Sequence, residues 1–305
     1  MRGTPRALPY LAVALAASSW GTWALVVRRA EAIAPMPSAL ESTVVMAVIT
    51  IVAGATSLRD RVAARRTWQA WASVAWFGVA DILNVLLFFA AYKLTIAVAV
   101  LTHYLTPIFV ALVAPFVLRE RMTARTGWAI AVSFLGLAVM IAPSGAAASG
   151  ATVWKSAALG AGSAVFYASN VLVNKSIVGS FSTSQAMFWH GIVATAVGLS
   201  LVPPGSWARI DSHAIMFLAL AALGPGALGG LAFVWGLRRM PAAHASTLTL
   251  LEPVVSLVLG AWALGESVGA PAILGGAMIL TGGLLVMTQP REPVLTEGSK
   301  GSVIP

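Results

Sequence analysis

Residues 105–120 of the chain read LTPIFVALVAPFVLRE, and residues 251–266 read LEPVVSLVLGAWALGE. Moving the chain by 146 positions, the separation of Pro107 and Pro253, superposes the two stretches without a gap. Further pairs then coincide: Glu120 with Glu266, Gly136 with Gly282, Trp20 with Phe166, and Ser38 with Ser184. Single matches mean little in a chain so rich in Ala and Leu, but proline, glutamate and glycine that match in order indicate an internal repeat.

This repeat divides the chain into two units, residues 1–146 and residues 147–292. The remaining tail, 293–305, is polar, and we expect it to be disordered.

Composition places both units in a membrane. Of the 305 residues, 59% are hydrophobic and 10% are charged, whereas a soluble domain carries about 25% charged residues. A membrane-spanning helix needs roughly 20 apolar residues. Ten runs are long enough or nearly so: 7–27, 38–58, 68–91, 95–118, 127–142, 156–174, 183–202, 213–237, 242–264 and 270–288. We therefore predict an all-α membrane protein with ten transmembrane helices, five in each repeat.

Because five is an odd number, the second repeat enters the membrane from the opposite side, so the two repeats are inverted. The first run can also be read as a cleaved signal peptide, because a basic segment precedes it. The run continues to Val27, however, and Arg28 and Arg29 close it as they would close a retained helix. Its place in the repeat supports the same reading.

The basic residues predict the orientation. With the N-terminus inside, the inner segments hold 14 of the 19 Lys and Arg residues and the outer loops hold 5. Inner loops of membrane proteins are enriched in Lys and Arg, so we expect a multi-pass protein of the cell inner membrane with both termini in the cytoplasm. The formal net charge of +9 is then a topology signal, and we expect no nucleic-acid partner.

Several kinds of chemistry find no support. Cysteine is absent, which excludes disulfides, thiolate catalysis and Cys-ligated metals. Gly224, Gly226 and Gly229 spell G-x-G-x-x-G, but the motif lies in an apolar helix and not after a strand, so we reject nucleotide binding there. No Walker A or HExxH motif occurs. We expect no cofactor, no metal and no enzymatic activity.

Two motifs carry a resemblance to a known family. Leu-Thr-Pro followed by Glu120, and Leu-Leu-Glu-Pro followed by Leu-Gly-Glu at 264–266, resemble the EamA branch of the drug/metabolite transporter superfamily over residues 7–288. Within that branch, Ser18–Trp23 and the His-Tyr pair before Pro107 are similar to the aromatic amino-acid exporters. The resemblance implies outward movement of Phe, Tyr, Trp and related amino acids through a central cavity.

Ionisable and polar groups within the apolar runs are the candidate substrate-binding residues, because they are costly at membrane depth. Asp81, Asn84 and Phe88 share one helix face at spacings of three and four. The sixth run repeats the pattern with Tyr167 and Asn170. The alternative for the polar groups is hydrogen bonding between helices that serves only packing.

Four further groups extend the candidate site. His103 and His190 lie in the middle of their runs and can bind substrate or transfer a proton, or they can be neutral packing residues. Thr249 and Glu252 lie on one polar stripe, where Glu252 can bind an ammonium group or cap backbone groups freed by Pro253. Aromatic faces for the substrate are offered by Trp20, Trp23 and Trp235.

Pro107 and Pro253 are candidate hinges, because each removes a helical hydrogen bond at a symmetry-related place. A static kink is the alternative. We therefore predict a secondary transporter that exports aromatic and other neutral amino acids by alternating access. Export of another small metabolite or drug, a membrane-embedded enzyme and a channel remain as alternatives. The expected partners are an amino-acid substrate, the lipid bilayer and, as a candidate coupling ion, the proton; we expect a monomer.

Overall fold

The computed structural model describes residues 7–60, 66–141, 150–209, 211–265 and 267–289. Every regular element within these ranges is helical, and no strand occurs in them. The first half contains α1 (Leu8–Trp20), α2 (Trp23–Ile33), α3 (Ser38–Ser57), α4 (Trp68–Tyr92), α5 (Ile96–His103), α6 (Thr106–Val117) and α7 (Ala124–Ile141). The second half contains α8 (Gly150–Ser176), α9 (Thr183–Leu201), η2 (Trp207–Arg209), α10 (Ser212–Ala221), η3 (Ala222–Leu228), α11 (Gly229–Leu237), α12 (Ala242–Leu248), α13 (Leu251–Leu264) and α14 (Ala270–Met287).

Eight helical segments in the described part of the chain are long and apolar enough to cross a membrane. They correspond to eight of the ten predicted runs. The other two runs are also helical but fall short of a full apolar span. The first breaks into α1 and α2 at Gly21–Thr22, and α1 has 13 residues. The seventh forms α9, whose 19 residues include Gln185 and His190.

Two of the long segments are interrupted at matching places. One helix stops at His103 and restarts at Thr106, and the other stops at Leu248 and restarts at Leu251. Pro107 and Pro253 therefore lie in the first turn of a new helix, where a missing N–H leaves no hydrogen bond unmade. The prolines follow helix breaks and do not kink a continuous helix.

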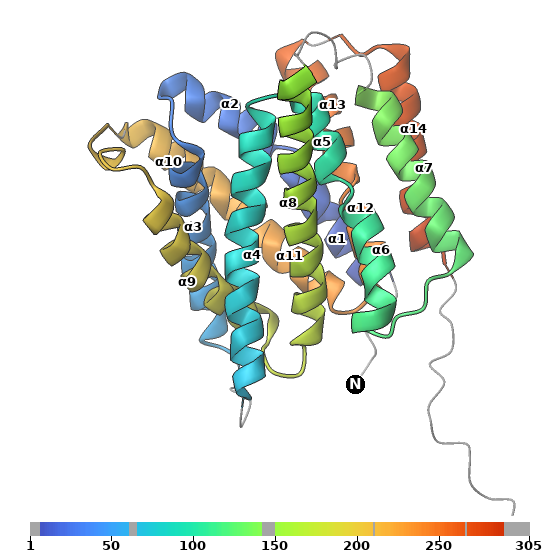
Figure 1. Ribbon diagram of the computed structural model, residues 1–305, viewed down its shortest axis with the longest axis horizontal. Coiled ribbons are helices and arrows are strands. Elements are labelled where there is room, and N and C mark those ends of the chain that lie inside the picture. The colour runs from blue at the N-terminus through green and yellow to red at the C-terminus, as the bar shows by residue number, and fades with distance from the viewer. Residues whose placement is uncertain (1–6, 61–65, 142–149, 210, 266, 290–305) are drawn as a thin grey trace, which may run out of the picture.

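Helices of the two halves pack against each other in pairs: α7 with α14, α3 with α9, α4 with α8, and α1 with α11 (Figure 1). Close approach depends on glycine. A Cβ atom at Gly136 of α7 would lie 2.6 Å from the Gly275 carbonyl oxygen of α14, so the backbones of these two helices are in direct contact. Glycine at helix crossings permits this approach in membrane proteins.

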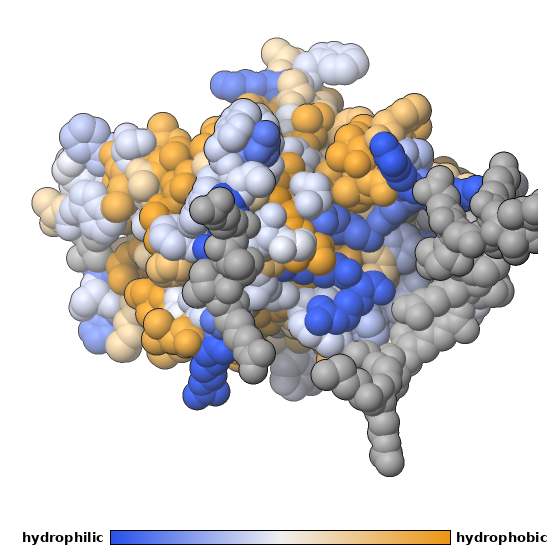
Figure 2. All heavy atoms as spheres, turned by 90° about the horizontal axis from the view of Figure 1, so that it is seen from below, coloured by the Kyte–Doolittle hydropathy of each residue, from blue (hydrophilic) through white to orange (hydrophobic). Residues whose placement is uncertain are grey.

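The ends of many helices meet at one end of the bundle, here called the basic face. This face lies at the bottom of Figure 1 and faces the viewer in Figure 2. Its surface there alternates between hydrophilic and hydrophobic patches. Arg66 bonds Ser180 and Gln185, Arg125 bonds Leu285 and Thr288, and Lys175 pairs with Glu120. Arg238 bonds Asn174 and Phe181. Burial, and then the charge of Arg239, lower the pKa of Arg238 to about 10, so it remains cationic at neutral pH.

The Glu120 carboxylate accepts from Lys175 and from the backbone N–H of Ala242, at the start of α12, so it binds both a basic residue and a helix end. The matching residue, Glu266, lies outside the described residues.

Candidate functional site

A cavity of about 230 Å³ lies between the two halves of the bundle. It is lined by residues of α1 to α5, of α8, α9, η3 and α11, and of the start of α13. Ten of the twelve predicted substrate-binding residues line it: Trp20, Trp23, Asp81, Asn84, Phe88, His103, Tyr167, Asn170, His190 and Glu252. The structure thus brings into one cavity residues that lie as far apart in the sequence as Trp20 and Glu252.

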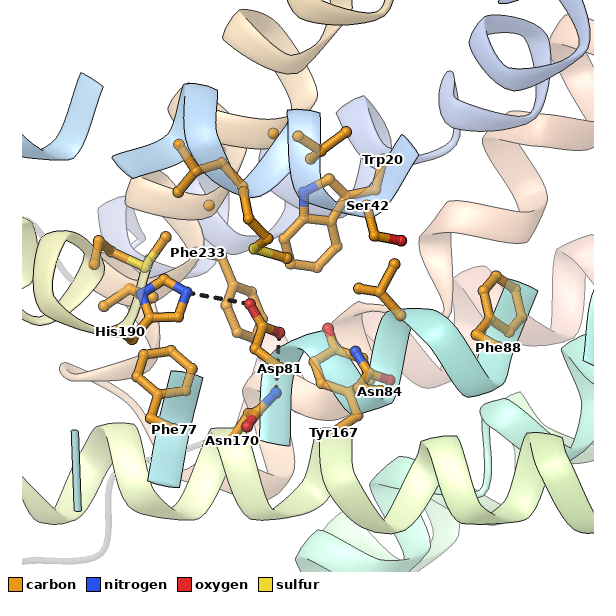
Figure 3. Close-up of a pocket in the computed structure, with 18 of the residues that line it drawn as sticks. Trp20, Ser42, Phe77, Asp81, Asn84, Phe88, Tyr167, Asn170, His190 and Phe233 are labelled. Carbon is orange, nitrogen blue, oxygen red and sulfur yellow. Dashed lines mark hydrogen bonds and ion pairs between the residues drawn. The ribbon is translucent and has the colours of Figure 1, made fainter. Parts of the chain in front are cut away.

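Asp81 is the centre of the polar part of this wall (Figure 3). Its Oδ2 lies 3.1 Å from Nε2 of His190, and its Oδ1 accepts a hydrogen bond from Nδ2 of Asn170 at 3.0 Å. The ring of Phe77, one helical turn before Asp81, stacks on His190 with centroids 4.1 Å apart. Helices α4, α8 and α9 therefore meet at a single carboxylate.

A second polar chain runs through His103. Its Nδ1 lies 2.8 Å from the Ser163 hydroxyl, which in turn lies 2.8 Å from Oδ1 of Asn84. The His103 ring also contacts two aromatic rings, those of Phe88 at 4.3 Å and Tyr167 at 5.5 Å between centroids. This part of the wall combines amide and imidazole groups with aromatic faces.

Trp20 and Phe233 add an aromatic pair to the cavity wall, with ring centroids 5.0 Å apart (Figure 3). The Trp20 indole N–H donates to the carbonyl of Pro225 at 2.8 Å. That carbonyl belongs to η3, a π-helical turn; such turns often occur at functional sites. The turn therefore fixes the orientation of Trp20.

Glu252 reaches the cavity from the first turn of α13, directly after the helix break. The Tyr104 hydroxyl, from the matching break between α5 and α6, interacts with its carboxyl group. Both helix breaks thus contribute to the surroundings of one acidic side chain.

Two predicted residues lie away from the cavity. Trp235 points elsewhere on α11, and its ring packs under the Arg239 guanidinium at 4.2 Å. Thr249 is fully buried, and its hydroxyl donates to the Ser246 carbonyl at 2.7 Å. Asn174, in the last turn of α8, is buried, lines the cavity and accepts a hydrogen bond from Arg238.

The cavity also has lining residues that the sequence interpretation missed. Phe77 could have been found, because it precedes Asp81 by four and extends the same helix face. The others are apolar or small and give no signal of their own; they include Ser42, Met46, Met187, Gly226, Gly230 and Phe233.

A bundle of apolar helices around a small cavity with ionisable side chains at mid-helix depth is typical of membrane transporters. The chain belongs to the EamA-like transporter family, whose sequence pattern matches residues 7–142 and again residues 154–288. This family membership points away from an enzyme.

Relatives support the class. The chain is 25% identical over 179 residues to an uncharacterized transporter of Clostridium kluyveri, a match that covers 56% of this chain and 57% of that protein. It is 26% identical over 212 residues to an uncharacterized transporter of Archaeoglobus fulgidus, covering 68% of this chain and 73% of that one. A solved crystal structure shares the fold, with a TM-score of 0.75 at 19% identity over 92% of this chain and 98% of its own.

Proposed function

We propose that the chain is a secondary transporter that exports amino acids, aromatic and other neutral ones, across the inner membrane by alternating access. The observation that carries this proposal is the cavity, whose wall includes the carboxylate of Asp81 and the rings of Phe77, Phe233 and Tyr167 (Figure 3). A carboxylate suits a substrate ammonium group, and aromatic rings suit an aromatic side chain.

The size of the cavity fits a small metabolite. Pockets for drug-sized ligands occupy about 300–1,000 Å³, and this cavity of about 230 Å³ is smaller. We assign the substrate contacts to the ten predicted residues that line it. The alternatives are export of another small metabolite or drug, and a membrane-embedded enzyme.

For the membrane arrangement we propose ten transmembrane helices in two inverted repeats, 1–146 and 147–292. The family pattern matches once in each repeat. In the proposed symmetry α4 corresponds to α11 and α8 to α1, and both pairs, α4 with α8 and α11 with α1, are in contact. We place the basic face in the cytoplasm, with both termini. Fusing a reporter after Gln289 should then give a cytoplasmic signal, and a truncation fusion after Ile141 a periplasmic one. A periplasmic signal from the first fusion would contradict the inverted arrangement.

The transport proposal is tested with purified protein in sealed vesicles. We expect saturable uptake of labelled phenylalanine, with no chemical change and no electrical conductance. A panel that includes tryptophan, alanine and a non-amino-acid aromatic tests the substrate class. Repeating the uptake with and without a pH gradient tests proton coupling, and the size of the detergent-solubilised particle tests the expected monomer. Absence of uptake across the amino-acid panel would refute the amino-acid part of the proposal.

A further inference from the structure

The charges around the cavity are of one sign. Asp81 and Glu252 are the acidic residues on its wall, and no Lys or Arg is found among the described residues that line it. Arg238 does not line the cavity, although its guanidinium donates to Asn174, which does. A zwitterionic amino acid therefore meets acidic side chains but neither Lys nor Arg on the described part of the wall.

His190 contacts Asp81 through one edge of its ring. The ring is 1% exposed, its Nε2 faces Asp81, and its Nδ1 has no hydrogen-bond partner. A protonated ring would bury an unpaired Nδ1–H donor, whereas the neutral tautomer with its proton on Nε2 leaves only a lone pair there. With its proton on Nε2, His190 donates to Asp81 without adding a positive charge to the wall, and the Asp81 side chain is 21% exposed.

The carboxylate of Asp81 suits a ligand group that donates hydrogen bonds and carries a positive charge. His190 Nδ1 and Asn170 Oδ1 are buried and lack a partner, but both point away from Asp81 (Figure 3) and do not face a group bound there. An ammonium group brings three donors and a positive charge. Asn174 Nδ2 is an unpaired donor on the wall, but it is uncharged and suits a carboxylate only weakly.

We propose that the cavity selects its substrate by the ammonium group, at Asp81, and that aromatic primary amines, which are aromatic amino acids without the carboxylate, are a further substrate class. This inference rests on the proposed site but goes beyond the proposed amino-acid export. The substrate carboxylate has no charged partner to lose, so its removal leaves binding intact.

Three ligands that share one phenyl ring test the idea: phenylalanine, phenethylamine without the carboxylate, and 3-phenylpropionate without the ammonium group. Binding is read as the ligand-induced rise in the melting temperature of the purified full chain, because a ligand that binds the folded state stabilises it. This reading does not depend on membrane permeability. We expect phenethylamine to raise the melting temperature at a concentration within about threefold of that needed for phenylalanine. For 3-phenylpropionate we expect the same rise to need a concentration about thirtyfold higher than for phenylalanine, or no rise at all.

The variant Asp81→Asn keeps the shape of the side chain and removes its charge. It should abolish the response to phenethylamine, and if it does not fold, the three-ligand comparison on the unmodified chain still decides. A response to 3-phenylpropionate equal to that of phenethylamine would overturn the inference. Phenylalanine binding without phenethylamine binding would overturn it too and leave amino-acid export standing. Phenethylamine binding without phenylalanine transport would support the inference and refute amino-acid export.

Discussion

The ammonium group of Lys175, near the end of α8, forms an ion pair with the carboxylate of Glu120, just beyond the end of α6. Their side chains are 15% and 20% exposed. Lys175 also donates to the Met240 carbonyl at 2.5 Å, and Glu120 also accepts from the Ala242 N–H at 2.7 Å. The pair therefore connects both halves of the chain at the basic face.

Glu120→Gln should destabilise the protein, because it leaves the Lys175 ammonium partly buried without a counter-charge. Breaking a fully buried pair costs about 3–5 kcal/mol and breaking an exposed one about 0–1 kcal/mol. For this partly exposed pair we expect about 1–3 kcal/mol, measured as a fall of several degrees in the melting temperature. Lys155→Met is the matched control, since Lys155 is exposed at the other end of α8. A double-mutant cycle with Lys175→Met should show strong coupling, and additive effects would rule out an energetically important pair.

The α7–α14 contact should tolerate no added methyl group. Gly136→Ala would place a Cβ atom 2.6 Å from the Gly275 carbonyl and 2.7 Å from Cβ of Met278, and such overpacking costs about 1–3 kcal/mol. Gly127→Ala in the same helix meets nothing within 4 Å and should be neutral or slightly stabilising, because alanine favours helix. Melting temperatures of the two variants test this, and equal values would show that the helices can move apart freely.

Much of the site followed from spacing within single helices. Asp81, Asn84 and Phe88 lie on one face of α4, and Tyr167 and Asn170 on one face of α8, as their spacings predicted. Such a pattern does not say which helices face each other, so the contact of Asp81 with His190 could not be foreseen. Long-range packing alone brings those two residues together.

The two residues that lie elsewhere show where spacing fails. On α11 the lining positions are Gly230, Phe233, Val234 and Leu237, and Trp235 is one position off this stripe, a rotation of about 100°. Thr249 was placed on a polar stripe that assumed a continuous helix. The helix breaks at Thr249–Leu250, so the stripe does not continue and only Glu252 reaches the cavity. The presence of Pro253 indicated a disturbance of the helix, but it did not predict that the helix would break at Thr249–Leu250.

Tyr167→Leu should weaken transport of phenylalanine or tryptophan more than that of alanine. The Tyr167 ring lines the cavity and stacks near His103, and an aromatic contact contributes about 0.5–1.5 kcal/mol beyond burial. The expected loss is therefore about two- to tenfold for the aromatic substrates. Phe166→Leu is the control, because the neighbouring ring packs against Trp76 outside the cavity. Equal losses for aromatic and small substrates would argue against stacking.

The last prediction concerns Pro107 and Pro253 as paired hinges. In Pro107→Ala the new N–H can bond the His103 carbonyl, four residues before it, and Pro253→Ala can likewise engage the Thr249 carbonyl. Each change favours joining the two half-helices across the break. Because the repeats are inverted in our proposal, the two breaks serve opposite faces, so the variants should shift the access equilibrium in opposite directions.

Access is measured with single cysteines, which the native chain lacks. Ser42, near the start of α3, and Leu237, at the end of α11, line the cavity from opposite ends of the bundle. We expect one proline variant to label faster at Ser42→Cys and the other at Leu237→Cys, each with slower turnover. Substrate affinity of the favoured state can survive, because a ligand shifts populations only through its differential affinity for the two states. Unchanged labelling together with normal transport would make both prolines static features of the helix breaks.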